Sequence, residues 1–258
     1  MKKLSLILLA ILTVALIGCK KDDDNNDNGG GNGGGSSSST ILLQESSKTL
    51  HHGDTYEIKA VCENPITYTS ENDYVAEVNG NGIVHANYVG ITNIILEDTV
   101  SSLQFKVTVA AESNLYTLPN INFGETRSTI ISRFGNPDYE DEDGLLYERE
   151  TETIYGYMIV FDDTNKVYTY VVIVKPGYGH ELANVFIPER YAFLGEADIY
   201  KYYMDALDLD DASTIVSATQ ETSTGYWIAA YMDKDYFRKD DMNSAMDAMQ
   251  NLVKKFVK

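Results

Sequence analysis

The sequence contains few of the residues that build disulfide frameworks or nucleic-acid interfaces. Of 258 residues, two are cysteine, four are histidine and one is tryptophan. Lysine and arginine together number 20 against 39 aspartate and glutamate residues, so the formal net charge is −19. An acidic surface of this kind repels a phosphate backbone, which excludes nucleic acid as a partner.

Long apolar runs are also scarce. The one prominent run, Leu4–Ile17, follows Lys2 and Lys3 and is almost wholly apolar. It is too short to span a bilayer comfortably and fits the apolar core of a signal peptide. The run ends in a small residue, Gly18, and then Cys19. We therefore expect residues 1–18 to be a signal peptide.

The residues Leu16-Ile17-Gly18-Cys19 resemble the lipobox of bacterial lipoproteins. The resemblance implies cleavage after residue 18 and attachment of fatty acyl chains, such as palmitate, to the sulfur and the new amino group of Cys19. Several chains on one residue anchor firmly, so the expected partner is a membrane and the expected location is the outer membrane. Loss of residues 1–18 removes two lysines and no acidic residue, which changes the net charge from −19 to −21. An ordinary secreted signal peptide with an incidental cysteine is the alternative.

With Cys19 consumed by the anchor, Cys62 has no partner for an intrachain disulfide. Cys62 follows Ile58, Ala60 and Val61 in a strand-like run. We expect it to be a small, buried, apolar residue.

Residues 19–40 are expected to form the lipidated, flexible linker. The segment from Asn25 to Ser39 is nearly all Asn, Asp, Gly and Ser, which cannot bury apolar surface. The run Lys20-Lys21-Asp22-Asp23-Asp24 resembles a surface-export tag of lipoproteins in one large group of Gram-negative bacteria. This run favours exposure at the cell surface, and an orientation facing the periplasm stays open.

Residues 41–111 carry short strand-like runs separated by turn residues about every ten positions, which is typical of a β-sandwich. The region resembles the bacterial Ig-like group 2 domain (BIG2), whose members serve mostly as spacers or adhesive modules. One position departs from the family pattern, because Tyr68 stands where the family usually has Trp. The resemblance rests on Tyr68-Thr69-Ser70-Glu71-Asn72, Val75-Ala76-Glu77-Val78, Asn81-Gly82-Ile83-Val84 and Gly90.

Residues 112–258 predict an α+β domain with an antiparallel sheet. A helix is expected around Ile130–Phe134, ended by Gly135, and an exposed strand over Leu145–Glu152. The strands Tyr155–Phe161 and Tyr168–Val174 predict an antiparallel hairpin. Further expectations are helices over Glu196–Ala206 and Asp210–Ala218, a strand over Gly225–Met232, and an amphipathic C-terminal helix from Met242 to Phe256 that packs on the sheet.

The whole chain is thus predicted to be multi-domain, with an Ig-like sandwich followed by this α+β head. The order of helix, stop and hairpin, with Gly124, Thr126 and Phe134-Gly135-x-Pro137, also resembles a small envelope module. That module occurs in outer-membrane assembly lipoproteins and in a secreted β-lactamase inhibitor. The resemblance implies a domain that binds other proteins and has no enzymatic activity.

No sequence motif for a hydrolase, a phosphate loop, a redox centre or a cofactor is present, so we expect a non-catalytic protein without cofactor or metal. His180 lies beside Glu181, but no nucleophile is placed near it. Asp141, Asp143, Gly144 and Glu150 follow part of a calcium-loop spacing within the acidic segment 138–150. The first position of that loop is Tyr139, which lacks a carboxylate, and calcium binding stays open.

The candidate ligand site consists of four tyrosines on the predicted hairpin. If Phe161 pairs with Tyr168, alternation places Tyr155, Tyr157, Tyr168 and Tyr170 on one face. Tyrosine rings with polar tips suit stacking on a glycan or a peptide. The alternative is that both faces are buried and the tyrosines belong to the core.

These observations favour a surface-anchored binding or adhesion lipoprotein, with the Ig-like domain as spacer and residues 112–258 as the head. A periplasm-facing protein-binding component and an enzyme acting on surface glycans are the two alternatives.

Overall fold

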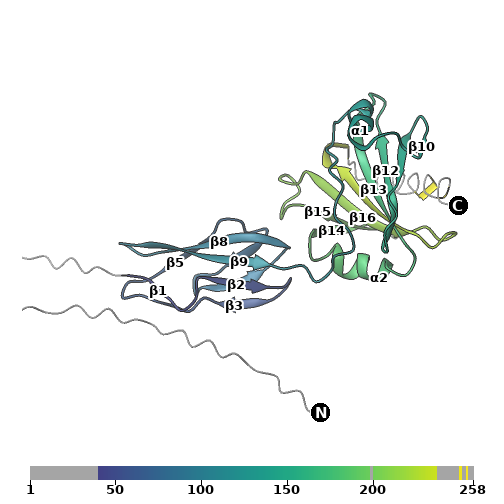
Figure 1. The fold of residues 1–258 in the computed structure, drawn as a ribbon. Coiled ribbons are helices and arrows are strands. Elements are labelled where there is room, and N and C mark those ends of the chain that lie inside the picture. Colours follow the sequence, from purple (N-terminus) through teal and green to yellow (C-terminus); the bar gives the residue numbers. More distant parts are fainter. Residues whose placement is uncertain (1–39, 198–199, 237–249, 252–253, 255–258) are drawn as a thin grey trace, which may run out of the picture. The chain divides into compact units, whose positions relative to one another are not determined.

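The computed structural model describes residues 40–197, 200–236, 250–251 and 254 (Figure 1). The chain divides into two compact units, residues 1–37 and 38–258. The described part of the second unit is rich in β-structure, with several sheets and few helices. The expected signal peptide, Cys19 and nearly all of the linker lie outside the described residues.

Residues 41–111 form three sheets. The first has the order β2-β9-β8-β5, the second β3-β7-β6, and the third is the two-stranded ribbon β1-β4. The strand-like runs expected at Ile83–Val84, Ile91–Leu96 and Phe105–Val109 all lie in strands, and the run at Val75–Val78 is a strand from Ala76. The bounds are β1 Leu42–Leu43, β2 Ser47–Leu50, β3 Thr55–Glu57, β4 Ala60–Val61, β5 Thr67–Ser70, β6 Ala76–Val78, β7 Ile83–Ala86, β8 Gly90–Glu97 and β9 Ser102–Val109.

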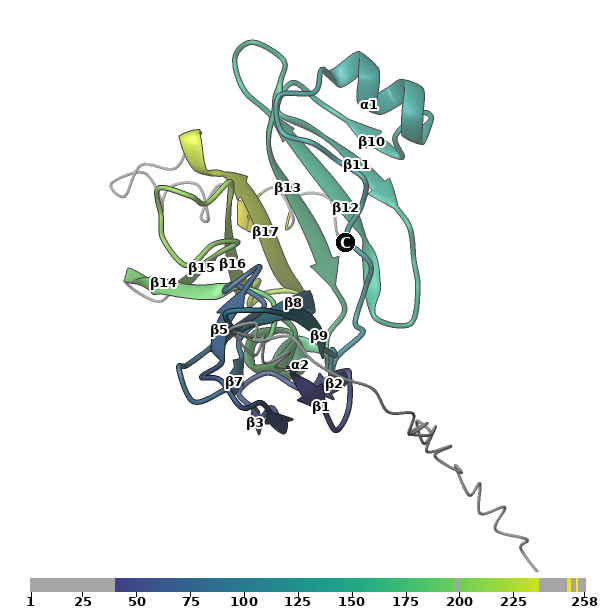
Figure 2. The same cartoon turned by 90° about the vertical axis from the view of Figure 1, so that its left-hand side faces the viewer.

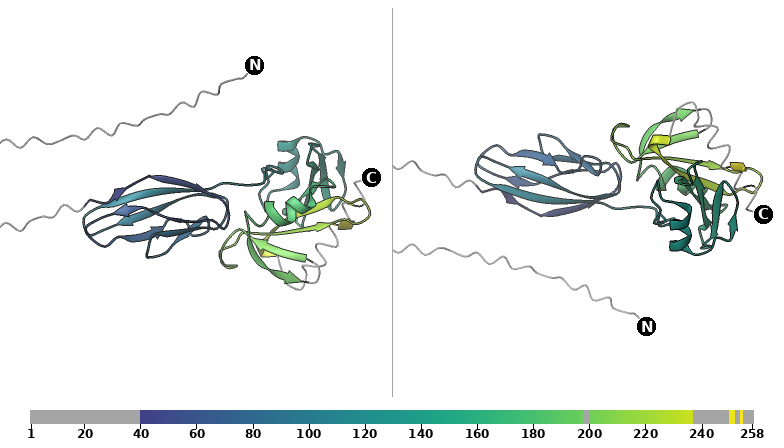
Figure 3. Two further views of the ribbon diagram at one scale, coloured as in Figure 1. Left: turned by 90° about the horizontal axis from the view of Figure 1, so that it is seen from below. Right: turned by 90° about the horizontal axis from the view of Figure 1, so that it is seen from above.

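The first two sheets share one apolar core, and Figure 3 shows them stacked face to face. Val84 and Ala86 of the second sheet pack with Ile94, Leu96 and Phe105 of the first, and all five side chains are fully buried. Along β8 and β9 every second residue faces this core, which is the expected consequence of period-two alternation.

The turn between β6 and β7 depends on Gly82. Its φ of 73° is a conformation that side chains disfavour, and a Cβ there would lie 2.8 Å from Cζ of Tyr68. The Asn79 side-chain oxygen accepts hydrogen bonds from the backbone N–H groups of Asn81 at 2.9 Å and Ile83 at 3.1 Å. The sequence signal Asn79-Gly80-Asn81-Gly82 therefore correctly predicts a turn.

The rest of the described chain builds one eight-stranded antiparallel sheet with the order β10-β11-β12-β13-β17-β16-β15-β14 (Figures 1 and 2). The hairpin predicted from residues 155 to 174 is present as β12 and β13. The bounds are β10 Tyr139–Glu140, β11 Gly144–Glu148, β12 Ile154–Phe161, β13 Val167–Val174, β14 Ala192–Ala197, β15 Tyr200–Met204, β16 Thr214–Gln220 and β17 Trp227–Asp233.

The helix α1, Arg127–Phe134, confirms the predicted helix and its end. The side chain of Thr126 caps its start by accepting from the N–H of Thr129 at 3.3 Å. Gly135 ends it with a φ of 84° and donates its N–H to the Ile131 carbonyl at 2.9 Å. Ile130 is fully buried against the sheet, so the apolar side of α1 covers one face (Figure 2).

Both faces of the eight-stranded sheet are buried. One face packs with α1 and with the π-helix Leu182–Phe186, which follows the short helix α2, Gly179–Glu181. The opposite face carries a second cluster that includes Met158, Val171 and Ile228. Strand β11 is therefore buried over four of its five residues, and the expectation of an exposed strand at Leu145–Glu152 is wrong.

The helices predicted over Glu196–Ala206 and Asp210–Ala218 are also wrong. These residues lie mostly in β14, β15 and β16, and four of the five residues of β15 are buried. Because both faces of the sheet are covered, the strands lack the polar-apolar alternation that identifies a half-buried strand. Tertiary packing thus overrides the local helix-like spacing.

The predicted C-terminal helix lies almost wholly outside the described residues. Gln250, one of the few described there, donates its side-chain amide to the Tyr200 hydroxyl at 3.3 Å and to Thr219 Oγ1 at 3.1 Å. Both partners belong to the sheet. No helix in the described part of the chain is long and apolar enough to cross a membrane.

The buried carboxylate of Glu189, which follows the π-helix, binds the backbone at the start of residues 112–258. Glu189 is 2% exposed and accepts hydrogen bonds from the N–H groups of Glu112 at 2.8 Å and Ser113 at 3.2 Å. It also forms an ion pair with Arg190, whose guanidinium donates to the Ser113 carbonyl at 2.7 Å. A buried charge is costly unless it is paired in this way.

Candidate functional site

The four tyrosines predicted to share one face, Tyr155, Tyr157, Tyr168 and Tyr170, lie on opposite faces of the sheet. Tyr157 and Tyr170 face the side covered by α1, whereas Tyr155 and Tyr168 face the other side. The single tyrosine surface expected from simple alternation does not form.

Two β-bulges between β12 and β13 cause this division. Each bulge inserts one extra residue, and because side chains alternate with period two, one extra residue sends a side chain to the opposite face. In β13, Tyr168 is the extra residue, since Val160 pairs with Thr169 and the next residue, Phe161, pairs with Val167. In β12, Tyr155 is the extra residue, since Ile154 pairs with Val174 and Gly156 pairs with Ile173.

Tyr170 belongs to the core. It is 7% exposed and stacks on Tyr231 with ring centroids 4.8 Å apart and an interplanar angle of 10°. The Tyr231 hydroxyl in turn lies 2.8 Å from that of Tyr116. Burial raises the pKa of Tyr231 well above its usual range, so these hydroxyls are neutral hydrogen-bonding groups. Tyr157 is half-buried on the same face.

Tyr155 and Tyr168 are half-buried on the other face and have ring partners of their own. Tyr155 meets Tyr226 edge-on at 5.7 Å, and Tyr168 lies 5.5 Å from Tyr236. Burial and a hydrogen bond to the Glu148 carboxylate raise the pKa of Tyr155 to about 12. The two residues therefore do not combine with Tyr157 and Tyr170 into one site.

A pocket of about 180 Å³ opens elsewhere on the α1 side of the sheet, between the π-helix and strands β15, β16 and β17. Its walls are mostly apolar and aromatic, and its polar groups include the Asn184 amide and the Lys201 amine. π-Helices are rare and frequently occur at functional sites. The lining residues are Ala183, Asn184, Ile187, Lys201, Tyr203, Ala218 and Trp227.

The indole of Trp227 is positioned by Gly179. A Cβ at Gly179 would lie 1.9 Å from Nε1 and 2.0 Å from Cε2 of Trp227, so only glycine allows this approach. Trp227 is half-buried and stands at the first position of β17, opposite Gln220 of β16. One side of the indole therefore rests on the backbone of α2, while the ring also lines the pocket.

The other aromatic wall is Tyr203, which is 8% exposed. Phe193 on the edge strand β14 is directly paired with Tyr203 and meets its ring edge-on at 5.6 Å. Phe193 is itself 55% exposed, so an apolar surface continues from the pocket to the edge of the sheet. Burial, and then the charge of Glu196, raise the pKa of Tyr203, which keeps its hydroxyl neutral.

Two exposed side chains, Lys201 and Asn184, add an amine and an amide to the lining. Lys201 Nζ lies 3.6 Å from the Glu196 carboxylate, and both side chains are well exposed. The Asn184 side-chain amide donates to the His180 carbonyl at 2.9 Å, which orients its Oδ1 as an acceptor. Solvent screens an exposed ion pair of this kind, so Lys201 can exchange Glu196 for a ligand at little cost.

The lining and the size of the pocket limit what it can hold. Its lining residues include neither a carboxylate nor a histidine, whereas most glycoside hydrolases use a pair of carboxylates. Drug-sized ligands occupy roughly 300–1,000 Å³, so this pocket has room for one ring or one side chain. Aromatic walls with an amine and an amide suit a small ring that carries polar substituents.

The pocket was not expected from the sequence, because helices were predicted where β15 and β16 lie. Lys201, Tyr203 and Ala218 were thereby assigned to two separate helices. One signal was available: the single tryptophan of the chain stands in a strand that was correctly predicted.

The other residues singled out in the sequence lie apart. His180 is in α2 and exposed. Asp141 Oδ1 accepts from the N–H groups of Asp143 and Gly144, both at 3.0 Å, and so shapes the β10–β11 turn. Glu150 pairs with Lys175 at 2.7 Å. In the described ranges no three His, Cys, Asp or Glu side chains are grouped as a metal site.

Cys62 is half-buried, and its thiol donates to the Asp98 carboxylate at 3.1 Å. This polar contact differs from the expected purely apolar environment.

No protein-family model matches the sequence, and no curated protein matches it. Among solved structures, the C-terminal domain of TagH aligns with 66% of this chain and 98% of its own, at 12% identity and a TM-score of 0.27. A likeness at this level supports no conclusion about fold or function.

Proposed function

We propose that this protein is a lipid-anchored bacterial binding protein of the outer membrane, displayed at the cell surface and without catalytic activity. Residues 41–111 are an Ig-like spacer, and residues 112–258 are an α+β head that holds the ligand site. The anchor rests on the lipobox resemblance at Cys19.

The observation that carries the binding function is the pocket beside Trp227. It combines two aromatic side chains with Lys201 and Asn184, and its lining has no acid–base pair for catalysis. The ligand is expected to be a ring-bearing group of a glycan or a protein.

The single tryptophan allows a direct test of this site. The chain from residue 40 onward is screened on glycan and protein arrays, and each positive ligand is titrated while the Trp227 fluorescence is recorded. Binding should change the emission. Lys201→Met and Ala218→Leu should weaken binding about tenfold or more, by removing a charge-assisted contact and by filling the pocket.

Ile91→Ser is the matched control, because Ile91 is an exposed apolar residue of β8 outside the pocket. If Lys201→Met and Ala218→Leu bind every array ligand as well as the unmodified chain does, the pocket is not the ligand site.

The anchor and the display are tested separately in cells. Cys19→Ala should abolish labelling by a radioactive or clickable fatty acid and release the protein from the outer-membrane fraction. Proteolysis of intact cells should remove the head if it is displayed at the surface. Protection of the head, with normal lipid labelling, supports the periplasm-facing alternative instead.

A further inference from the structure

Four large apolar side chains are exposed at one end of residues 41–111. Leu42 is 63% exposed, Val61 71%, Val100 59% and Leu103 37%. Single exposed apolar residues are ordinary on protein surfaces, but several at one end of a domain indicate a contact surface. We call these four residues the apolar end.

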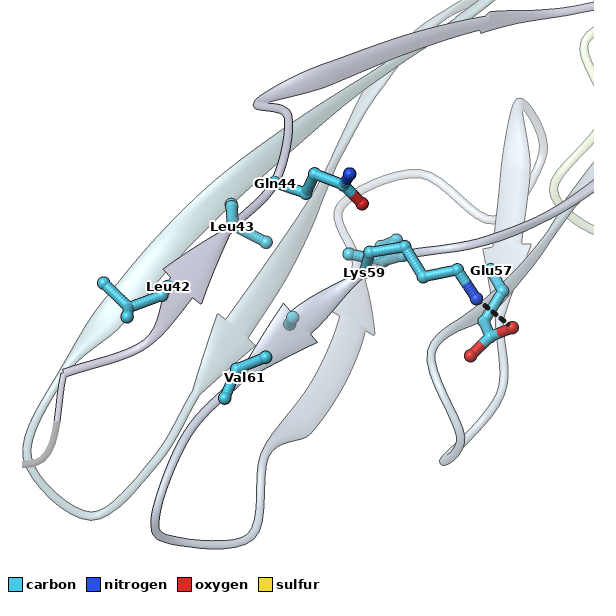
Figure 4. Close-up of a pocket in the computed structure, with 8 residues that line it drawn as sticks. Leu42, Leu43, Gln44, Glu57, Lys59 and Val61 are labelled. Atoms are coloured by element: carbon cyan, nitrogen blue, oxygen red, sulfur yellow. Dashed lines mark hydrogen bonds and ion pairs between the residues drawn. The ribbon is translucent and has the colours of Figure 1, made fainter. Parts of the chain in front are cut away.

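The first two residues are direct neighbours. Leu42 of β1 and Val61 of β4 are opposite each other in the two-stranded ribbon, so their side chains stand on the same side. Figure 4 shows both side chains on the ribbon, where they line an open pocket of about 480 Å³. The ion pair between Lys59 and Glu57 lies farther along the ribbon.

Val100 lies at the same end because two hydrogen bonds join its turn to the segment after β4. The Cys62 thiol donates to Asp98 at 3.1 Å, and the Asn64 amide donates to Thr99 Oγ1 at 3.1 Å. Val100 is therefore in the β8–β9 turn, next to the end of the β1–β4 ribbon.

Leu103 marks where the core stops. Along β9 it shares a face with Phe105, Val107 and Val109, which are all buried. Leu103, at the second position of β9, is 37% exposed, whereas these three residues are at most 1% exposed. The apolar end is thus the open end of the shared core together with the ribbon and the turn.

This end is also where the chain enters from the anchor. Twenty residues, 20–39, separate Cys19 from the first described residue. A Gly- and Ser-rich chain of this length has a root-mean-square span of about 25 Å. A tether with this span would keep the β1–β4 ribbon close to the membrane that carries the lipid. The effective concentration of the ribbon at that membrane would be of millimolar order. Even a weak interaction with that surface would then be populated.

We propose that the apolar end is a bilayer-contact surface, and that Leu42, Val61 and Val100 insert into the interfacial layer of the membrane that carries the lipid anchor. This inference rests on the proposed lipidation of Cys19. It assigns residues 41–111 a second role, because contact of this end with lipid restricts how the domain stands on the membrane.

The charges around the apolar end predict its lipid preference. Glu63 and Asp98 lie next to the inserted residues in sequence and structure. Anionic lipid headgroups repel such carboxylates within about one Debye length, roughly 8–10 Å. Contact should therefore be stronger on zwitterionic phosphatidylcholine than on vesicles rich in phosphatidylglycerol.

The test uses chemical anchoring, so that it does not depend on lipidation in cells. Residues 19–258 with Cys62→Ser are coupled through Cys19 to a maleimide lipid in phosphatidylcholine vesicles. Val100→Trp is introduced on a Trp227→Phe background, and quenching by brominated phosphatidylcholine is measured. We expect quenching at least about threefold stronger than for a matched Ile91→Trp chain, because bromine on the acyl chains quenches only a tryptophan that enters the membrane.

Ile91 is the appropriate control because it is also exposed and lies at the other end of β8, about 20 Å along the strand from Glu97. Adding Leu42→Ser and Val61→Ser should reduce the Val100→Trp quenching to the Ile91→Trp level. A thermal melt of each variant excludes unfolding as the cause.

Equal quenching at both tryptophan positions overturns the inference. So does quenching that persists unchanged after Leu42→Ser and Val61→Ser. If the coupled chains instead dimerise through this end, sedimentation of the soluble chain shows a dimer that Leu42→Ser dissociates, and the lipid contact is again wrong. None of these results affects the fatty-acid labelling that tests the anchor.

Discussion

The carbonyl oxygen of Tyr147 lies 2.1 Å from the position that a Cβ on Gly156 would occupy. Strands β11 and β12 thus approach each other closely at this point, next to the bulge that sends Tyr155 to the far face. The glycine is required because the obstacle is backbone, which cannot rotate away as a side chain can.

Gly156→Ala should therefore destabilise the protein by about 1–3 kcal/mol, since a tightly packed site must shift to admit the methyl group. Urea unfolding followed by circular dichroism measures the change. Gly80→Ala is the matched control, because nothing lies within 4 Å of its Cβ position, and it should change stability by less than about 0.5 kcal/mol. Similar values for both variants would contradict the close approach.

Gly179→Ala should displace the indole of Trp227. The added methyl group would overlap Nε1 at 1.9 Å, so the ring must leave its place against α2. Because Trp227 is the single tryptophan of the chain, its emission maximum reports this movement directly. We expect a shifted spectrum and a loss of about 1–3 kcal/mol. An unchanged spectrum with full stability would show that the indole does not rest on Gly179.

The hydrogen bond between Tyr116 and Tyr231 should appear as a coupling energy. Tyr231 is fully buried, and its hydroxyl lies 2.8 Å from that of Tyr116. Tyr116→Phe and Tyr231→Phe should each cost about 1–2 kcal/mol, because each leaves a buried hydroxyl without this partner. The double variant should cost less than the sum of the two by about 1 kcal/mol, measured as a double-mutant cycle. Strict additivity would show that the two hydroxyls do not interact.

Glu221 should contribute stability that is lost in acid. Burial opposes ionisation of its carboxylate, but hydrogen bonds from Thr224 and Ser223 dominate and lower its pKa from 4.5 to about 2. The four donors are the backbone N–H and the hydroxyl of each residue, at 2.6–3.0 Å. Since the folded pKa lies below the unfolded one, the contribution is complete above pH 4.5 and is lost as pH falls through about 2.

Unfolding at a series of pH values should show the unmodified chain losing about 2 kcal/mol more than Glu221→Gln between pH 5 and pH 2. At pH 7 Glu221→Gln should be less stable than the unmodified chain. The difference between their free energies of unfolding should become smaller as the pH falls. A constant difference across this range would mean that the carboxylate is not specifically stabilised.

The sequence predicted the local elements whose signals are short-range. The end of α1 at Gly135 was predictable because such a cap requires only neighbouring backbone groups. The strands β12 and β13 were recognisable from their β-branched and aromatic residues, and the Asn79–Gly82 turn from its glycines. The expected anchor at Cys19 likewise depends on a contiguous motif.

Tertiary structure decided the elements whose environment comes from distant residues. Tyr200, Tyr202 and Met204 are buried on one face of β15 and Tyr203 on the other, so the strand shows no alternation that sequence reasoning can detect. The helices predicted there were wrong for that reason, and with them the pocket beside Trp227 remained hidden.

The hairpin of β12 and β13 also depended partly on local sequence and partly on tertiary structure. Its two strands followed from local composition, but the faces of its side chains depended on register. Two bulges, at Tyr155 and Tyr168, separate residues that simple alternation places together. A bulge depends on how a strand pairs with its neighbours, and a pattern within one strand does not record that pairing.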